Sequence, residues 1–256
     1  MRLMLLALLL CSAAAAQKPE YAFYSEYRDF MSSLWVKNQS ITPAQVHAAY
    51  QSKLKADGIP DHEIARRIKV LETQSAQLEA DRWDRYFSNA SNEKHFSQKP
   101  NGFLMSFAAD RRPGVALDYA MGTGRNAIYL AQLGWDVYGF DHSKVAVAEA
   151  QKQAVFQKLK LHTAAVSDSE YDFGKERFDL IVFSWSMPLI DTRKVIDSLK
   201  PGGTVLMECA VDYVGRNGML KKFDGLRIER YEIVRGLADW YDRHEVEIIR
   251  MIARKQ

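Results

Sequence analysis

The chain has 256 residues, of which 47% are hydrophobic and 26% are charged, and its formal net charge is +3. These values are ordinary for a globular protein with one sizeable core, and the sequence holds no repeats or low-complexity segments. Because the charge is small and the basic residues form no stripe with aromatic ones, we expect no nucleic-acid substrate.

The first sixteen residues combine Arg2, an apolar run over 3–10 and an alanine-rich end at 13–16. This pattern is typical of a secretory signal peptide cleaved after Ala16. The run is well short of the roughly 20 residues that span a bilayer, so we expect no stable membrane insertion after cleavage. We therefore expect an exported protein, periplasmic or secreted. The alternative is a cytoplasmic chain that keeps an apolar N-terminus.

Residues 17–99 have the pattern of helices. Thr42 is followed by Pro43 and Gln45, which is the signature of a helix start with a capping box. A further helix is indicated because four aliphatic residues repeat at helical spacing on one face. They are Ile64, Ile68, Leu71 and Leu78. We expect residues 17–99 to form an N-terminal helical cap region. It would lie at the strand ends of a sheet that belongs to the second domain, residues 100–256.

From Pro113 onward, short apolar runs alternate with helical stretches, which predicts parallel strands joined by helices. The expected strands are 115–119, 135–140, 161–166, 178–184 and 204–209, and the expected helices are 126–133 and 144–159. Two final strands, 226–234 and 245–253, have little room for a helix between them and should pair antiparallel. The predicted fold class is α/β, a doubly wound, mostly parallel, seven-stranded sheet of Rossmann-like type.

The first predicted strand runs into a glycine-rich turn that contains Gly122 and Gly124 and leads into a helix. Glycine lets the backbone turn tightly and approach a ligand, and the start of the helix offers free N–H groups. Asp141 follows the second predicted strand, where a carboxylate can bind both hydroxyls of a ribose. Together these residues predict an adenosine-containing ligand at the switch point of the sheet.

Two classes of protein share this arrangement, and Asp118 distinguishes them. The spacing of Gly122, Gly124 and Ala127 also fits the dinucleotide fingerprint of nicotinamide-dependent oxidoreductases. A carboxylate two residues ahead of the turn would lie close to a pyrophosphate and repel it, whereas it suits a ligand with a cationic amino-acid end. Asp118 therefore favours the second kind of ligand, and the oxidoreductase stays the alternative.

Four segments resemble the motifs of class I S-adenosylmethionine-dependent methyltransferases. They are 116–131 with the glycine-rich turn, 134–143 with the ribose-binding acid, 178–182 as the fourth strand and 199–204 as the turn into the fifth. The resemblance is closest to the small-molecule branch that includes tellurite- and thiopurine-type enzymes. It covers about residues 100–256 and leaves 17–99 without a counterpart.

The resemblance implies S-adenosylmethionine as cofactor and a set of residues that would contact it. The set is Asp118, Ala120, Gly122, Gly124, Asn126, Asp141, His142, Asp168, Ser169, Ser184 and Trp185. Asp168 or Ser169 should lie near the adenine, and Ser184 and Trp185 near the methionine portion and the methyl group. The alternatives are a solvated loop acid at Asp168 and a core residue at Trp185. Ala120 stands where the family usually has glycine, and its methyl group crowds the approach of the backbone to the ligand.

The same resemblance implies in-line methyl transfer to a small-molecule acceptor, for which proximity and orientation supply most of the rate enhancement. The acceptor pocket is expected from three largely aromatic and apolar segments. These are Asn101–Phe103, Trp185–Met187 and Asp212–Leu220. No residue is nominated as a general base, although Glu208 and Cys209 end the fifth predicted strand near the site, and no metal site is expected. Ala120 and the expected export keep a non-catalytic binding module open, because the cofactor is made in the cytoplasm.

Overall fold

The computed structural model describes residues 19–37, 41–89, 97–186, 192–240 and 245–256. The predicted signal peptide, residues 1–16, lies outside these residues. Among the helices described, none combines the length and the hydropathy that crossing a bilayer requires.

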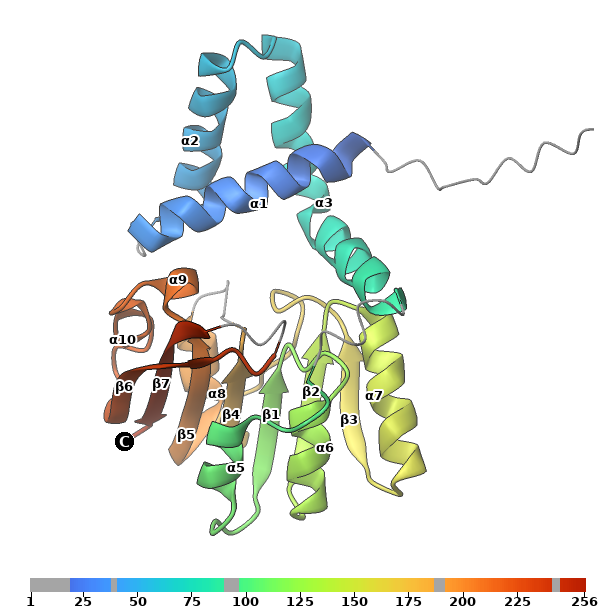
Figure 1. The fold of residues 1–256 in the computed structure, drawn as a ribbon, viewed down its shortest axis with the longest axis vertical. Coiled ribbons are helices and arrows are strands. Elements are labelled where there is room, and N and C mark those ends of the chain that lie inside the picture. The colour runs from blue at the N-terminus through green and yellow to red at the C-terminus, as the bar shows by residue number, and fades with distance from the viewer. Residues whose placement is uncertain (1–18, 38–40, 90–96, 187–191, 241–244) are drawn as a thin grey trace, which may run out of the picture.

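A seven-stranded sheet forms the centre of the fold, with the strand order β3-β2-β1-β4-β5-β7-β6 (Figure 1). The strands are β1 (Val115–Tyr119), β2 (Asp136–Asp141), β3 (Leu161–Ala165), β4 (Phe178–Ser184), β5 (Leu199–Ala210), β6 (Arg227–Leu237) and β7 (Glu245–Arg254). The first five run parallel, and β7 and β6 close the sheet as an antiparallel pair. The predicted fold class, including the antiparallel pair at the end, is confirmed.

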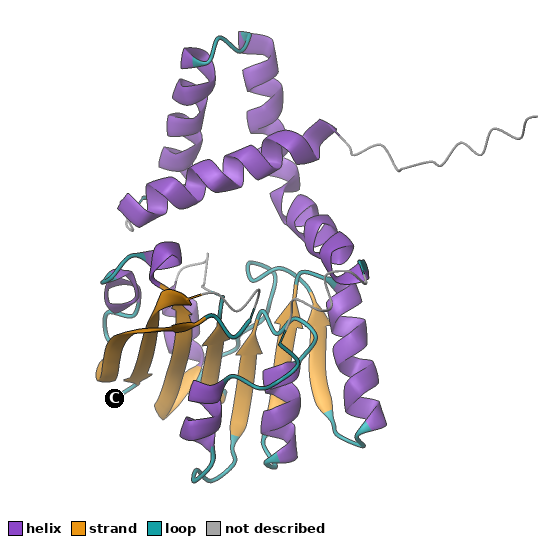
Figure 2. Ribbon diagram, in the orientation of Figure 1, coloured by secondary structure: helices purple, strands orange, loops and turns teal. Residues whose placement is uncertain are grey.

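Helices cover both faces of the sheet (Figures 1 and 2). One face carries α5 (Gly102–Ala108), α6 (Arg125–Gln132) and α7 (Lys144–Phe156); α8 (Thr192–Ser198), α9 (Val211–Val214) and α10 (Gly218–Lys222) follow later in the chain. The alternation along β1 explains the two layers. Ala116 packs in a cluster with Leu104 of α5 and Leu130 of α6, whereas Leu117 packs in a second cluster with Val195 of α8. Because both faces are buried, the strands read as continuous apolar runs.

Several element boundaries differ from the expectation. β5 begins at Leu199 instead of residue 204, since its pairing with β4 contains an irregularity next to Phe178. The helix expected over 144–159 ends at Phe156, because Lys158 takes a left-handed backbone conformation with φ of 58°. Asp141 is the last residue of β2 and not the first residue after it.

The N-terminal residues form three helices, α1 (Pro19–Lys37), α2 (Pro43–Ala56) and α3 (Asp61–Ser88), which we call the helical unit. Thr42 begins α2 with the capping box that the sequence predicts. The aliphatic face of α3 is buried as expected, at Ile64, Ile68, Leu71 and Leu78. These side chains share a core with aromatic residues of α1 and with Tyr50 of α2, so the helical unit has a hydrophobic cluster separate from those of the sheet.

The last turns of α3 reach the carboxyl ends of the parallel strands (Figure 1). Asp84 Oδ1 accepts hydrogen bonds from Ser143 Oγ at 2.7 Å and from the backbone N–H of Val145 at 3.2 Å, at the start of α7. Trp83 packs edge-on against Trp240, with 5.9 Å between ring centroids. The helical unit is therefore attached to the edge of the sheet at which the glycine-rich turn lies.

Candidate active site

The glycine-rich turn joins β1 to α6 and is held against β2, because Met121 N–H donates to the carbonyl of Phe140 at 2.9 Å. Gly124 begins α6 with a φ of 82°. A Cβ at this position would lie 2.9 Å from the Cβ of Ala150 in α7. Glycine at 124 therefore serves both the left-handed backbone and the close packing of α6 on α7.

Asp118 lies at the carboxyl end of β1 and is 2% exposed. Its Oδ2 accepts a hydrogen bond of 3.0 Å from the backbone N–H of Ala127, in the first turn of α6. Burial raises the pKa of this carboxyl to about 7, an effect that the Ala127 bond and the charge of Arg125 oppose and the charge of Asp141 reinforces. A cation beside Asp118 would favour its ionised form.

Asp141 ends the neighbouring strand β2 and accepts from the backbone on both oxygens. Oδ2 receives the N–H of Gly122 and Oδ1 the N–H of Ser143, each at 2.9 Å. Burial raises the pKa of Asp141, and the two backbone hydrogen bonds lower it. A carboxylate oxygen has two lone pairs, so both oxygens can still accept from hydroxyl groups. The two acids thus lie at the ends of adjacent parallel strands and on either side of the turn.

Ala120 opens the turn in a left-handed conformation, with φ of 52°. This conformation costs an L-residue roughly 1–2 kcal/mol, whereas glycine adopts it freely. The backbone therefore gives a second reason why glycine is usual at this position, in addition to the crowding expected from the sequence. Phe87 of α3 covers the same turn: a Cβ at Gly122 would lie 3.5 Å from its ring.

The two residues expected near an adenine, Asp168 and Ser169, follow β3, and His142 follows β2. Asp168 is 7% exposed and its Oδ2 accepts from the Tyr119 hydroxyl at 2.5 Å. The alternative of a solvated loop acid is therefore wrong. Ser169 Oγ lies 2.9 Å from Ser167 Oγ. His142 is half-buried, and its buried Nδ1 has no hydrogen-bond partner within the described part of the chain.

Trp185, directly after β4, is 8% exposed and has a φ of 57°. Its backbone N–H donates to the carbonyl of Glu208 at 2.7 Å, and its indole Nε1–H donates to Asp239 Oδ1 at 2.5 Å. The preceding Ser184 Oγ lies 3.3 Å from Arg125 Nη2, which can donate to it. Trp185 is therefore buried, as the core alternative requires, and also held by a polar contact at the expected site.

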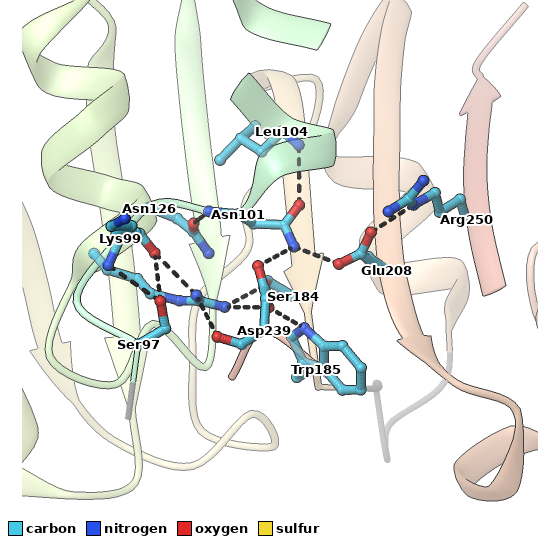
Figure 3. Close-up of polar contacts among 11 residues, drawn as sticks. Ser97, Lys99, Asn101, Leu104, Asn126, Ser184, Trp185, Glu208, Asp239 and Arg250 are labelled. Carbon is cyan, nitrogen blue, oxygen red and sulfur yellow. Dashed lines mark hydrogen bonds and ion pairs between the residues drawn. The ribbon is translucent and has the colours of Figure 1, made fainter. Parts of the chain in front are cut away.

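A network of polar side chains surrounds these two residues (Figure 3). Asn101 is fully buried and lies at its centre. Its Nδ2 donates to Glu208 Oε1 at 2.5 Å and to Asp239 Oδ2 at 3.0 Å, and its Oδ1 accepts from Leu104 N–H at the start of α5. The backbone N–H of Asn101 donates to Asn126 Oδ1 at 2.8 Å. The network thus joins α5, α6, β5 and the segment after β6.

Three members of this network were missed from the sequence. Arg125 donates through Nη2 to Asp239 Oδ1 at 3.1 Å and through Nη1 to the carbonyl of Lys99 at 2.9 Å. Arg250 Nε donates to Glu208 Oε2 at 2.7 Å. Arg125 could have been found, since it directly follows the last glycine of the turn. Asp239 and Arg250 lie in no motif, and only the pairing of β6 and β7 with the sheet brings them here.

The structure places the three segments that we expected to line an acceptor pocket in different surroundings. Asn101 and Trp185 both contact Asp239. Met187 lies outside the described residues. The segment Asp212–Leu220 is not one loop: residues 215–217 join the short helices α9 and α10, which hold the rest of it, and Met219 is fully buried. Cys209 is buried in the core, and burial raises the pKa of its thiol to about 12.

Comparison with known proteins agrees with this geometry. The family description "Methyltransferase domain" matches residues 116–203. The "Probable S-adenosyl-L-methionine-dependent methyltransferase TehB" of Haemophilus influenzae is 28% identical over 113 residues, which cover 42% of this chain and 39% of that protein. The chain thus matches about two fifths of the length of this curated relative.

Two solved structures share the fold. The crystal structure of TehB from Haemophilus influenzae has a TM-score of 0.51 and 20% identity, over 70% of this chain and 67% of that one. The crystal structure of the [4+2]-cyclase SpnF has a TM-score of 0.57 and 15% identity, over 70% of this chain and 96% of that one.

The fold and the turn define a nucleotide-binding Rossmann-like protein. The family match identifies it further: the chain contains a class I S-adenosylmethionine-dependent methyltransferase domain. S-adenosylmethionine is the cofactor of this class, and the site fits it, because two buried acids flank the turn and a buried nitrogen of His142 has no hydrogen-bond partner among the residues that the structure describes. The nicotinamide alternative is therefore set aside. Among the described residues, no three His, Cys, Asp or Glu side chains gather as a metal ion would require.

Proposed function

We propose that the protein is an S-adenosylmethionine-dependent methyltransferase that acts on a small-molecule acceptor by in-line transfer. The observation that carries this proposal is the pair Asp118 and Asp141, buried at the ends of adjacent strands on either side of the glycine-rich turn. An acid near a cationic amino-acid end and a second acid near a ribose are what this donor needs.

Most of the expected contact residues have a role in this proposal. Asp118 pairs with the ammonium group of the methyl donor, and Asp141 accepts hydrogen bonds from the ribose hydroxyls. His142, Asp168 and Ser169 lie on the adenine side, and Ser184 and Trp185 lie on the methionine side with the turn between them. When bound, the cofactor supplies a methyl group that is already activated on a sulfonium. The work left to the chain is to orient the acceptor and exclude water.

A small and mostly uncharged acceptor is supported by the rings at the mouth of the site. The Trp83 ring packs against both Phe87 and Trp240, and Phe87 lies beside the turn. The charged groups of the neighbouring network are satisfied by each other, because Asp239 pairs with Arg125 and Glu208 with Arg250. Apolar walls with few free charges favour an apolar or aromatic molecule.

The proposal is tested by isothermal titration with S-adenosylmethionine and S-adenosylhomocysteine, followed by transfer of a labelled methyl group to a panel of small thiols, phenols, amines and chalcogen oxyanions. We expect binding of both donor forms and label transfer to at least one class. Absence of binding to either would refute the proposal, and a thermal shift with NAD(H) alone would restore the oxidoreductase.

A non-catalytic binding module is the second candidate, and Ala120 favours it because its left-handed backbone carries a methyl group at the turn. The reaction also does not follow from the fold, since the [4+2]-cyclase SpnF has a similar fold. Tight binding of S-adenosylhomocysteine without methyl transfer to any member of a broad panel would favour this candidate.

We also propose that residues 1–16 direct export, that 17–99 form a helical cap region and that 100–256 form the methyltransferase domain. The sequence pattern of the first segment and the separate hydrophobic cluster of the helical unit support this division. N-terminal sequencing of the native protein after cell fractionation tests the first point: an intact Met1 in a cytoplasmic fraction would contradict export.

A further inference from the structure

Asp239 is the acid on which three elements of the site converge (Figure 3). It follows β6, more than 110 residues after the glycine-rich turn. Its Oδ1 accepts from Trp185 Nε1 at 2.5 Å and from Arg125 Nη2 at 3.1 Å, and its Oδ2 accepts from Asn101 Nδ2 at 3.0 Å. One carboxylate thus binds donors at the end of β4, the start of α6 and the start of α5.

Trp185 needs such a partner because its backbone is strained. A bulky residue at a φ of 57° is uncommon, and this backbone conformation is strained. Strain of this kind persists only where the surroundings fix the residue at several points. Here the backbone N–H is fixed by the Glu208 carbonyl and the indole by Asp239. Removing the acid releases the side chain at the point where we place the donor methyl group.

Arg125 needs the same acid because its charge is almost removed from solvent. Its side chain is 8% exposed, and Asp239 is its ion-pair partner at 3.1 Å. A buried guanidinium without a counter-charge is costly and reorients toward water. Arg125 begins α6 directly after Gly124, so a change in its orientation acts on the turn itself.

The helical unit holds the position of Asp239 through the next residue. Trp240 packs against Trp83 of α3, and its carbonyl accepts from Ser97 N–H at 3.2 Å. Asp239 and Trp240 therefore contact different parts of the protein. The acid contacts Trp185 and Arg125 in the site, and the Trp240 ring contacts the helical unit. The placement of the acid is fixed from both sides.

We propose that Asp239 is a positioning residue of the methyl-transfer site, which orients Trp185 and Arg125 and thereby sets the affinity for the methyl donor. The inference rests on the proposed function, because it assigns Asp239 to the site that binds S-adenosylmethionine. It is independent of the acceptor.

The test compares Asp239→Asn with the wild-type full chain. S-adenosylhomocysteine affinity is measured by titration, and the contribution of Trp185 to the near-ultraviolet circular dichroism is obtained by subtracting Trp185→Phe in each background. Because Asn keeps the shape and loses the charge, we expect an affinity about tenfold weaker, as for a lost hydrogen bond to a charged group, and a smaller Trp185 signal. Asp239→Glu should restore part of both.

Glu245→Gln is the matched control. Glu245 begins β7 in the same hairpin and pairs with Arg235 at 3.1 Å, with both side chains more than 60% exposed. An exposed pair of this kind contributes little, so affinity and the Trp185 signal should stay at wild-type values.

A merely structural role would lower the melting temperature of Asp239→Asn but leave the affinity and the Trp185 signal of the folded protein unchanged, and this result would overturn the inference while the proposed function stands. A wild-type protein that binds no S-adenosylhomocysteine would overturn both. Should Asp239→Asn not fold, Trp185→Phe and Arg125→Met remove the two donors singly. Each should weaken binding severalfold, and unchanged affinity in both would overturn the inference.

Discussion

The two halves of the candidate site are built in different ways. The half around the glycine-rich turn is local, because Asp118, Gly122, Gly124 and Asp141 lie within 24 consecutive residues of one strand–helix–strand unit. The half around Asn101 is non-local, because its members extend from Lys99 to Arg250. The first half uses backbone groups and isolated acids, whereas the second uses side chains that satisfy one another. A binding motif can thus be local while the network that orients it is not.

From the contrast between the two halves we predict that substitutions in the local half change ligand affinity most strongly. Asp141→Asn removes the charge at the ribose position, and we expect S-adenosylhomocysteine to bind about 100-fold more weakly, as for two lost hydrogen bonds to a charged group. Isothermal titration measures the effect. Asp136→Asn is the control, because Asp136 lies at the opposite, exposed end of the same strand and contacts His162. Equal affinities for the two variants would show that Asp141 has no part in binding.

Substitutions in the non-local half should mainly lower the free energy of unfolding. Asn101→Ala leaves Glu208 and Asp239 without their shared donor and removes the N-cap of α5. We expect the free energy of unfolding to fall by about 2–3 kcal/mol, measured by chemical denaturation. Asn217→Ala is the control, since Asn217 begins α10 without a side-chain capping bond and is exposed. A loss below that of the control would indicate that the network contributes nothing to folding.

The pH dependence of the free energy of unfolding should report on Asp118, the buried acid at the end of β1. The pKa of Asp118 is about 7 in the folded protein against an ordinary value of 3.8. The folded state therefore holds this proton more tightly than the unfolded state, so the stabilisation is complete below about pH 4 and is lost as the pH rises through 7.

Asp118→Asn should abolish this part of the pH dependence. Between pH 5 and 8 we expect the wild-type protein to lose about 2–3 kcal/mol of stability relative to Asp118→Asn. Denaturation midpoints at the two pH values measure the difference. Parallel profiles for the two proteins would contradict the raised pKa of Asp118.

The smallest effect is expected at Ala120. Ala120→Gly relieves the left-handed backbone but increases the entropy of the unfolded chain, so the net stabilisation should be at most about 0.5–1 kcal/mol. Binding of S-adenosylhomocysteine should tighten severalfold at most, because the crowding methyl group is gone. Ala131→Gly, within α6, should instead destabilise by about 1 kcal/mol. A loss of stability at both positions would indicate that Ala120 is not strained.

Much of the fold was predictable because its signals are local. Alternation of apolar runs and helical stretches predicted the parallel strands, and the short gap between the last two runs predicted the antiparallel pair. The capping box at Thr42 was correct because a helix start depends on only four residues. The boundaries of β5 and α7 were less accurate, since an irregular pairing with Phe178 and the backbone at Lys158 decided them.

The sequence by itself determined that the ligand contains adenosine and favoured a donor with a cationic end, because Asp118, the two glycines and Asp141 come together within one strand–helix–strand unit. Only the tertiary structure decided which side chains orient the turn. Asp239 reaches Trp185 and Arg125 because β6 and β7 add to the sheet beside β5, a pairing that no local pattern near residue 239 encodes. The position of Phe87 over Gly122 follows from the packing of α3 on α7 and is likewise absent from any motif. Local geometry fixes what the site can bind, and long-range packing fixes how its side chains are held.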